Sequence, residues 1–142
     1  MTYQEEDFFQ FINNLKNVVN SVIIVEGKND QKALEFWNIQ TPIEPITHPW
    51  FEFIDFIMNK YSKDVQIILL LDADPQGKEY VKKLKTEFRQ FGYKVNTGFW
   101  IKIQRFHITC IEGLDSHHFR GLKQRYDLAY IDEKDKDEIL DK

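Results

Sequence analysis

The chain has 142 residues, of which 42% are hydrophobic and 15% aromatic, so we expect one globular domain with a sizeable core. Its 19 Lys and Arg and 23 Asp and Glu give a formal net charge of -4, which excludes an overall basic surface for nucleic acid but leaves open a local basic track. The chain has one cysteine, no apolar stretch near the roughly 20 residues of a membrane span, and an acidic N-terminus without signal-peptide order, so we expect a cytosolic protein with no disulfide and no membrane contact.

Apolar residues recur at helical spacing in the first part of the chain and are interrupted by strand-like runs. The predicted elements are a helix over 3–19, a strand over 21–25, a helix over 30–37 capped by Asn29, a short strand within 41–47, and a helix with Pro49 at its first position. The run 21–25 has no polar alternation, which is typical of a strand that is covered on both faces of a parallel sheet.

The second part of the chain continues this alternation. The predicted elements are a strand over 66–71, a helix from about 76 to 91, a strand over 93–97, a helix or an irregular extension of that strand over 99–106, a strand over 108–111 and a short helix over 115–124. We therefore expect a single α/β domain over 1–142, with a mostly parallel central sheet, helices on both faces and right-handed crossovers. Its expected parts are an extra N-terminal helix over 1–19, a core over 20–113, and a C-terminal helix and charged tail over 114–142.

Both long apolar runs stop at carboxylates. Glu26 follows the first run, and Asp72 and Asp74 follow the second. Parallel sheets bind ligands at their C-terminal edge, so the three side chains converge there if the two strands lie side by side. Carboxylates that lie this close together raise each other's pKa, and such a cluster is suited to bind a divalent cation. The alternative for Asp72 and Asp74 is a polar turn after a buried strand.

The two strand-end motifs together resemble the Toprim domain, which topoisomerases, bacterial-type primases, OLD-type nucleases and small ribosomal-RNA maturases share. In that family a Glu-Gly pair ends one strand and an Asp-x-Asp pair with a nearby glycine ends another. Here Glu26-Gly27 matches the first motif, and Asp72-Ala73-Asp74 with Gly77 matches the second. The resemblance covers about residues 20–113 and is greatest to small stand-alone archaeal Toprim proteins of unknown role. It implies a Toprim-like core, with Ile111-Glu112-Gly113-Leu114 similar to a later segment of those proteins.

The resemblance implies that Glu26, Asp72 and Asp74 form a catalytic site for Mg²⁺, with one or two ions and with Mn²⁺ as a substitute. Asp72 and Asp74 would be metal ligands, while Glu26 would complete the metal shell or act as a general acid or base toward a phosphodiester oxygen. The chain departs from the family pattern at uncharged residues where the family often has charges, namely Pro75, Gln76, Gly98, Phe99 and Trp100.

Basic residues near these carboxylates are candidates for substrate phosphates. Lys28 stands two residues beyond Glu26, where it could neutralise a phosphate, and a solvent-facing charge is an equal alternative. Lys78 and Lys82 begin a basic row on the predicted helix 76–91; the row is either a phosphate track or an ordinary solvated face. The full row consists of Lys78, Lys82, Lys85 and Arg89. Asp30 is either a metal contact through water or a first-turn residue that the helix dipole favours.

The other chemically active residues form no site by spacing. His117 and His118 are adjacent and face different directions on a helix, so we interpret them as surface residues, and His48 and His107 have no partner at ligand spacing. Cys110 lies in an apolar run and is interpreted as a small core residue. The aromatic residues Phe99, Trp100 and Phe106 either belong to the core or stack on bases.

These features predict Mg²⁺-dependent phosphoryl transfer on nucleic acid, either RNA or DNA. Nuclease or RNA-processing cleavage is favoured over primase-like synthesis and topoisomerase activity, because the chain has no other primase parts and no catalytic tyrosine domain. The alternative is a non-catalytic Toprim module that binds RNA or a protein complex through a metal-held phosphate. The order of the acidic motifs excludes a haloacid-dehalogenase phosphatase and a response-regulator receiver.

Overall fold

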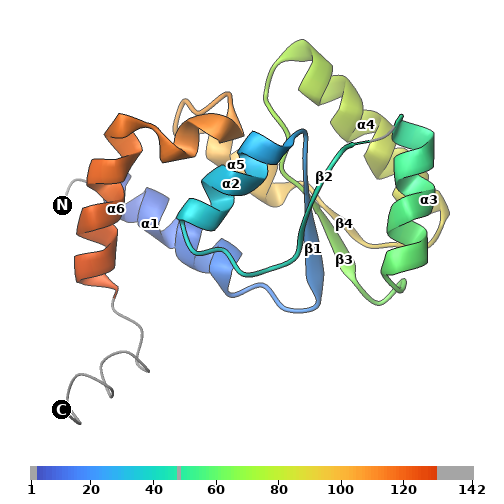
Figure 1. Cartoon of the computed structure of the whole chain (residues 1–142), viewed down its shortest axis with the longest axis horizontal. Helices are drawn as coiled ribbons and strands as arrows, with labels where there is room; N and C mark the ends of the chain where they lie inside the picture. Colours follow the sequence, from blue (N-terminus) through green and yellow to red (C-terminus); the bar gives the residue numbers. More distant parts are fainter. Residues whose placement is uncertain (1–2, 48, 131–142) are drawn as a thin grey trace, which may run out of the picture.

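Four parallel strands form the centre of the fold, in the order β2-β1-β3-β4 (Figure 1). The computed structural model describes residues 3–47 and 49–130. The strands are β1 Ser21–Val25, β2 Ile43–Pro45, β3 Gln66–Leu69 and β4 Val95–Asn96. The predicted α/β class with a parallel sheet is confirmed.

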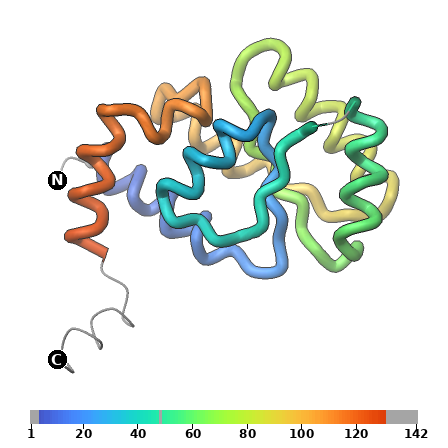
Figure 2. The backbone as a smooth tube through the Cα atoms, in the orientation of Figure 1, coloured from blue at the N-terminus to red at the C-terminus, as the bar shows by residue number. Residues whose placement is uncertain are grey.

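Helices cover both faces of this sheet, as predicted. They are α1 Tyr3–Lys16, α2 Lys28–Phe36, α3 Trp50–Lys60, α4 Pro75–Gln90, α5 Gly98–Gln104, the 3₁₀ helix η1 Ile111–Asp115, and α6 His117–Ala129. The core on one face is formed with α3 and α4, and the core on the other with α1, α2, α5, η1 and α6. Figure 2 shows this division, with the green helices on one side of the strands and the blue and orange segments on the other. None of the described helices is long and apolar enough to cross a membrane.

The two central strands bury every side chain except that of Gln66, which is half-buried at the start of β3. Successive residues of these strands face opposite helical layers. Val22 and Ile24 of β1 pack in the core with α3 and α4, whereas Ile23 and Val25 pack in the core with α1 and α2. All five residues of β1 are buried. This two-sided burial explains the unbroken apolar runs in the sequence, since a strand with one solvated face would alternate.

The direction of chain winding reverses between β1 and β3. From β1 the chain passes through α2 to β2 at one edge, and from β3 it passes through α4 to β4 at the opposite edge. Because α2 and α4 lie on opposite faces of the sheet, the carboxyl ends of β1 and β3 form a topological switch point. Ligands of doubly wound α/β folds bind at such a point. The topology thus fixes the position of the site before any side chain is considered.

Several predicted helix ends were wrong by a few residues. α1 ends at Lys16 rather than at residue 19, and Asn20, with a φ of 50°, lies directly before β1. α2 begins at Lys28 with Gly27 as its N-cap, so the predicted cap at Asn29 was wrong. Pro49 is the N-cap of α3 rather than its first residue.

The predicted strand over 108–111 was also wrong. This segment has no strand and runs into η1, in which Ile111 and Leu114 are buried. Ile108 is buried as well, and the spacing of three between these apolar residues fits the three residues per turn of a 3₁₀ helix. Cys110 is exposed, so its interpretation as a core residue was wrong. The charged tail over 131–142 lies outside the described residues.

Trp37 joins α2 to the C-terminal part of the fold. Its side chain is fully buried, and its indole N–H donates a hydrogen bond of 2.8 Å to the carbonyl oxygen of Leu114. Rings of Phe8 and Tyr126 meet it edge-on at centroid distances of 5.3 and 5.7 Å. The indole is therefore the point where α1, α2, η1 and α6 meet.

Trp37→Phe is expected to lower the free energy of unfolding by about 2–3 kcal/mol, because it leaves a cavity and an unpaired buried carbonyl at Leu114. Urea denaturation followed by circular dichroism measures this loss. The control is Trp50→Phe on α3, where the tryptophan is only partly buried, and a loss below about 1 kcal/mol is expected. Equal losses in the two variants would contradict the role assigned to Trp37.

Candidate functional site

Glu26 and Asp72 meet at the switch point between β1 and β3. Glu26 directly follows β1, and its Oε1 accepts a hydrogen bond of 3.3 Å from the backbone N–H of Asp72. This contact joins residues that lie 46 positions apart. The expected convergence of the two strand ends is therefore present in the structure.

Asp72 and Asp74 each hold a neighbouring segment in place. Asp72 Oδ1 accepts a hydrogen bond of 3.0 Å from the backbone N–H of Ile111, at the start of η1. Asp74 is the N-cap of α4, and its Oδ1 accepts a hydrogen bond of 2.7 Å from the N–H of Gly77. Both carboxylates thus have the structural role that a polar turn requires, in addition to any role in binding.

Gly77 allows α4 to start directly against Asp72 and Glu26. A Cβ atom at this position would lie 1.8 Å from the backbone oxygen of Asp72 and 2.9 Å from Glu26 Oε1. No other residue fits there without moving the loop after β3. The glycine that follows the Asp-x-Asp pair is therefore required by close backbone approach rather than by an unusual φ.

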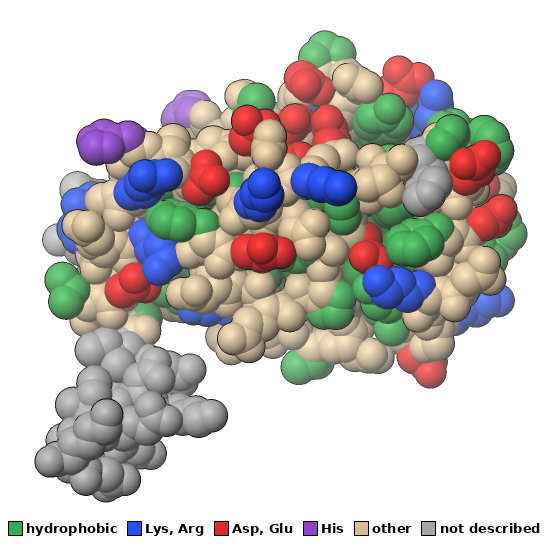
Figure 3. Space-filling model, viewed as in Figure 1, with side chains coloured by type: hydrophobic (Ala, Val, Ile, Leu, Met, Phe, Trp, Pro, Cys, Tyr) green, Lys and Arg blue, Asp and Glu red, His purple; other side chains and the backbone are tan. Residues whose placement is uncertain are grey.

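Asp30 and Glu112 add negative charge to the site. Asp30 of α2 is buried, and its Oδ2 accepts a hydrogen bond of 2.9 Å from the N–H of Gly27. This bond confirms the interpretation of Asp30 as a first-turn helix residue. Glu112 of η1 is exposed and raises the pKa of Asp30 through its charge. We name Glu26, Asp30, Asp72, Asp74 and Glu112 the acidic edge; Figure 3 shows acidic side chains gathered over this end of the central strands.

The acidic edge strongly perturbs Glu26. Burial is the largest cause and the charge of Asp72 the next, and together with weaker effects of Asp74 and Asp30 they raise the pKa of Glu26 from 4.5 to about 7. The hydrogen bond from the N–H of Asp72 lowers this pKa but does not offset the rise. Burial also raises the pKa of Asp30. The charged groups that act most strongly on Glu26 are the carboxylates of Asp72, Asp74 and Asp30, and each of them raises its pKa.

The donor set and the charge of this edge suit a hard divalent cation, which prefers carboxylate oxygens. The arrangement as it stands is not a ligand cage: within 3–47 and 49–130, no three His, Cys, Asp or Glu side chains are placed to hold a metal ion. Glu26, Asp72 and Asp74 each turn one oxygen toward a backbone N–H. A cation would have to use their second oxygens, with rotation of the side chains.

Comparison with known proteins places the chain in a family. The UPF0292 protein MJ1624 of Methanocaldococcus jannaschii is 37% identical over 94 residues, which are 65% of this chain and 72% of that protein. The chain belongs to the UPF0292 family. The solved structure of a protein from Aquifex aeolicus matches this UPF0292 fold with a TM-score of 0.64 at 30% identity, over 72% of this chain and 94% of that one. No known family profile matches the sequence.

The names of these two proteins specify no activity, so the function of this UPF0292 member has to be argued from its site. The three lysines predicted to contact phosphates are exposed: Lys28 is the first residue of α2, and Lys78 and Lys82 lie in the first half of α4. Since α2 and α4 both begin at the acidic edge, all three are placed beside it. The sequence interpretation missed the contribution of η1, which brings Glu112 to the same edge.

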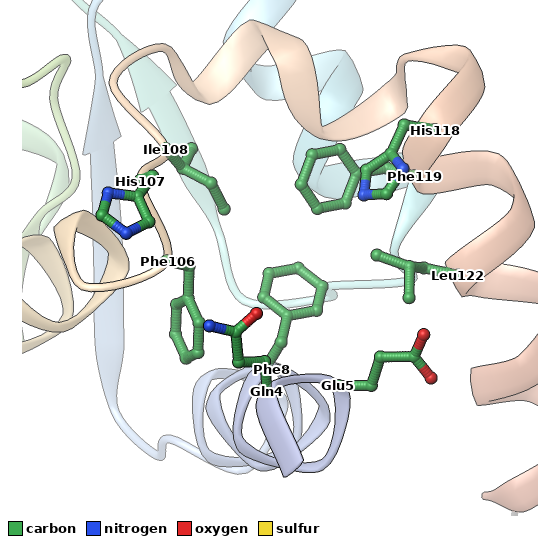
Figure 4. A pocket seen from close by; sticks show the side chains of 9 residues that line it. All are labelled: Gln4, Glu5, Phe8, Phe106, His107, Ile108, His118, Phe119 and Leu122. Carbon is green, nitrogen blue, oxygen red and sulfur yellow. The ribbon is translucent and has the colours of Figure 1, made fainter. Parts of the chain in front are cut away.

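A separate pocket of about 200 Å³ lies between α1, the segment 106–108 and α6. Figure 4 shows that Phe8, Phe119 and Leu122 line its interior, while the rings of His107 and His118 stand on different sides of it. His117 and His118 are exposed, as their interpretation as surface residues requires. No residue of the acidic edge lines this pocket, so we do not connect it with the chemistry of the carboxylates.

Proposed function

We propose that this protein is a Toprim-like, Mg²⁺-dependent phosphoryl-transfer enzyme that acts on nucleic acid in the cytosol, by nuclease or RNA-processing cleavage. The observation that carries the proposal is the acidic edge at the switch point, where Glu26 and Asp72 are in contact and the pKa of Glu26 is raised to about 7. Clustered carboxylates that raise each other's pKa favour binding of a divalent metal. The sequence order of the Glu-Gly and Asp-x-Asp motifs supports the same conclusion.

The roles of the residues follow from their positions. Asp72 and Asp74 would hold Mg²⁺ through the oxygens that do not accept backbone hydrogen bonds, and Mn²⁺ would bind in the same way. When bound, one or two such ions supply charge neutralisation and polarisation at a phosphoryl group. Glu26, with a pKa near neutrality, is suited to transfer a proton to or from a phosphodiester oxygen. Lys28 would bind a neighbouring phosphate.

A second candidate function is a non-catalytic Toprim module that binds RNA or a protein complex through a metal-held phosphate. The hydrogen bonds of Asp72 to Ile111 and of Asp74 to Gly77 favour this candidate, because they give both carboxylates a structural role. A protein that only binds would need the metal but would not need Glu26 to transfer a proton. Measurement of substrate cleavage therefore distinguishes the two candidate functions.

The test is incubation of the protein with labelled single- and double-stranded RNA and DNA, in Mg²⁺, in Mn²⁺ and in chelator. The matched variant is Asp72→Asn/Asp74→Asn, because asparagine retains a side-chain oxygen that can accept the bonds from Ile111 and Gly77 while removing both charges. Cleavage that requires metal and falls at least about 100-fold in the variant is expected. Metal-dependent binding without cleavage would instead support the non-catalytic candidate.

Thermal unfolding of the variant in chelator is the control for this experiment. Without metal, removal of two negative charges from the acidic edge is expected to leave the protein at least as stable as the wild type, because the repulsion on Glu26 is reduced. A variant that is folded and cleaves as fast as the wild type would overturn the assignment of the site.

A further inference from the structure

A shallow groove of about 380 Å³ runs along α4, on the side that faces α5. Its α4 wall carries Lys78, Lys82, Lys85 and Arg89, and Trp100 of α5 forms part of the opposite wall. We name it the basic groove. No carboxylate lines it, although the chain as a whole has a net charge of -4. Its positive charge is therefore a local feature that the composition conceals.

The cations of the basic groove are not used to neutralise the protein's own acids. None of the four forms an ion pair with any residue in 3–47 or 49–130. Lys83 on the same helix differs, because its Nζ lies 3.1 Å from Glu79 Oε1. An ordinary solvated helix face is expected to pair opposite charges at this spacing, as Lys83 does. The four groove residues are instead available to an external anion.

The basic groove runs along α4 from the acidic edge toward the C-terminal end of the helix. Its first cation, Lys78, lies one helical turn after Asp74, which caps α4 at the acidic edge. From Lys78 to Arg89 the helix rises by about 16 Å, at 1.5 Å per residue. A chain of phosphates bound along these cations would therefore arrive at the carboxylates.

Trp100 suggests which kind of polyanion fits. The side chain is half-buried, and its indole Nε1 is shielded from solvent and has no hydrogen-bond acceptor among the described residues. A basic groove that follows a backbone, with an aromatic side chain at its wall, is the usual arrangement for single-stranded nucleic acid. An acidic peptide would use the cations but would not need the aromatic wall.

We propose that the basic groove binds the sugar-phosphate backbone of single-stranded nucleic acid and leads the strand to the acidic edge. The destination of the strand rests on the function proposed above, whereas binding in the groove requires no metal. Lys82, Lys85 and Arg89 contact successive phosphates, and Lys78 holds the phosphate nearest the carboxylates. Trp100 contacts the strand at the opposite wall.

The test measures binding of fluorescent 12-nucleotide oligo(U) and oligo(dT) by anisotropy, in chelator and over a range of salt concentrations. Lys85→Gln/Arg89→Gln is compared with Lys60→Gln/Lys83→Gln, which removes the same charge outside the basic groove. We expect at least a tenfold loss of affinity in the groove variant and less than a twofold loss in the control. The salt slope, log Kd against log salt, is expected to fall by about 1.4, since each phosphate contact contributes about 0.7 for single strands.

Three results would overturn the proposal: equal losses in both variants, an unchanged salt slope in the groove variant, or tighter binding of a 12-base-pair duplex than of the single strand. Displacement of the strand by polyglutamate at equal charge concentration would also overturn it, in favour of an acidic protein partner. Trp100→Phe keeps an aromatic side chain but replaces the indole with a smaller ring that has no N–H, so a loss of affinity in this folded variant supports a contact at that wall.

The proposal for the basic groove and the proposal for the acidic edge can be contradicted independently by these experiments. Strand binding that depends on Lys85 and Arg89, without cleavage under any condition, supports the basic groove and contradicts the proposed enzyme. Cleavage that depends on Asp72 and Asp74, with an unchanged rate at low substrate concentration in Lys85→Gln/Arg89→Gln, supports the enzyme and contradicts the groove.

Discussion

Gly77→Ala is expected to lower the free energy of unfolding by about 3 kcal/mol or more. The added Cβ would lie 1.8 Å from the backbone oxygen of Asp72, and backbone cannot move aside as a flexible side chain can. The start of α4 would have to shift, with loss of the 2.7 Å bond between the Gly77 N–H and Asp74 Oδ1. Chemical denaturation measures the loss, and any activity of the acidic edge should fall with it.

Gly121→Ala provides the matched control for this prediction. Gly121 lies within α6, and a Cβ atom built on it meets nothing within 4 Å. The same substitution is therefore expected to stabilise the protein by about 0.5–1 kcal/mol, because alanine restricts the unfolded chain and favours the helix. If both variants were equally stable, close approach at Gly77 would not be the reason for glycine there.

Glu26→Gln is expected to stabilise the protein above pH 7 and to flatten its pH dependence in the absence of divalent metal. The folded pKa of Glu26 is raised to about 7 from 4.5, so between these values the folded state binds more protons than the unfolded state. Stability of the wild type therefore falls as pH rises from about 4.5 to 7 and levels off above that. After allowance for solvent screening of this partly exposed group, we expect a gain of about 1–2 kcal/mol in the variant at pH 8.

Thermal unfolding from pH 4 to pH 8 in chelator measures this effect. Asp30 remains in the variant, and its raised pKa leaves a residual slope of the same sign toward the acid end of the range. Wild-type stability that rises between pH 5 and pH 7 more steeply than that of Glu26→Gln would contradict a raised pKa of Glu26 in the folded state.

Added Mg²⁺ is expected to reverse the order of the two proteins at pH 8. A ligand that binds only the folded state adds about 2.7 kcal/mol when its concentration is 100 times its Kd, which exceeds the lead of about 1–2 kcal/mol expected for the variant. The wild type would gain this stability because three ionised carboxylates are present, and Glu26→Gln would gain less. Equal responses of the two proteins to Mg²⁺ would remove Glu26 from the proposed metal site.

The sequence allowed the sheet to be predicted because its central strands are buried on both sides. Residues 21–25 and 66–71 contain no polar interruption that a solvated face would require, and each ends at a carboxylate. Their parallel pairing then follows from the crossover helices between them. The contact between Glu26 and Asp72 is a direct result of this pairing.

The part of the structure after residue 105 could not be predicted in the same way. The β-branched residues of the segment 108–111 favour a strand locally, but its conformation is decided by packing of Ile111 and Leu114 against α2. Tertiary contacts of this kind override local propensity. The positions of Glu112 at the acidic edge and of Trp100 beside the basic groove could not be predicted either. Helical periodicity does not indicate which distant segments of a chain pack together.

The hydrogen bond from the Ile111 N–H to Asp72 Oδ1 links residues that are 39 positions apart. A cation that drew this carboxylate away would leave the amide of Ile111 without its acceptor, at the N-terminal end of η1. If the cation destabilises η1, then by thermodynamic reciprocity a change that destabilises η1 alters the affinity of the acidic edge for the cation by the same factor. The exchange rate of that single amide with deuterated water would therefore report whether Asp72 binds a cation.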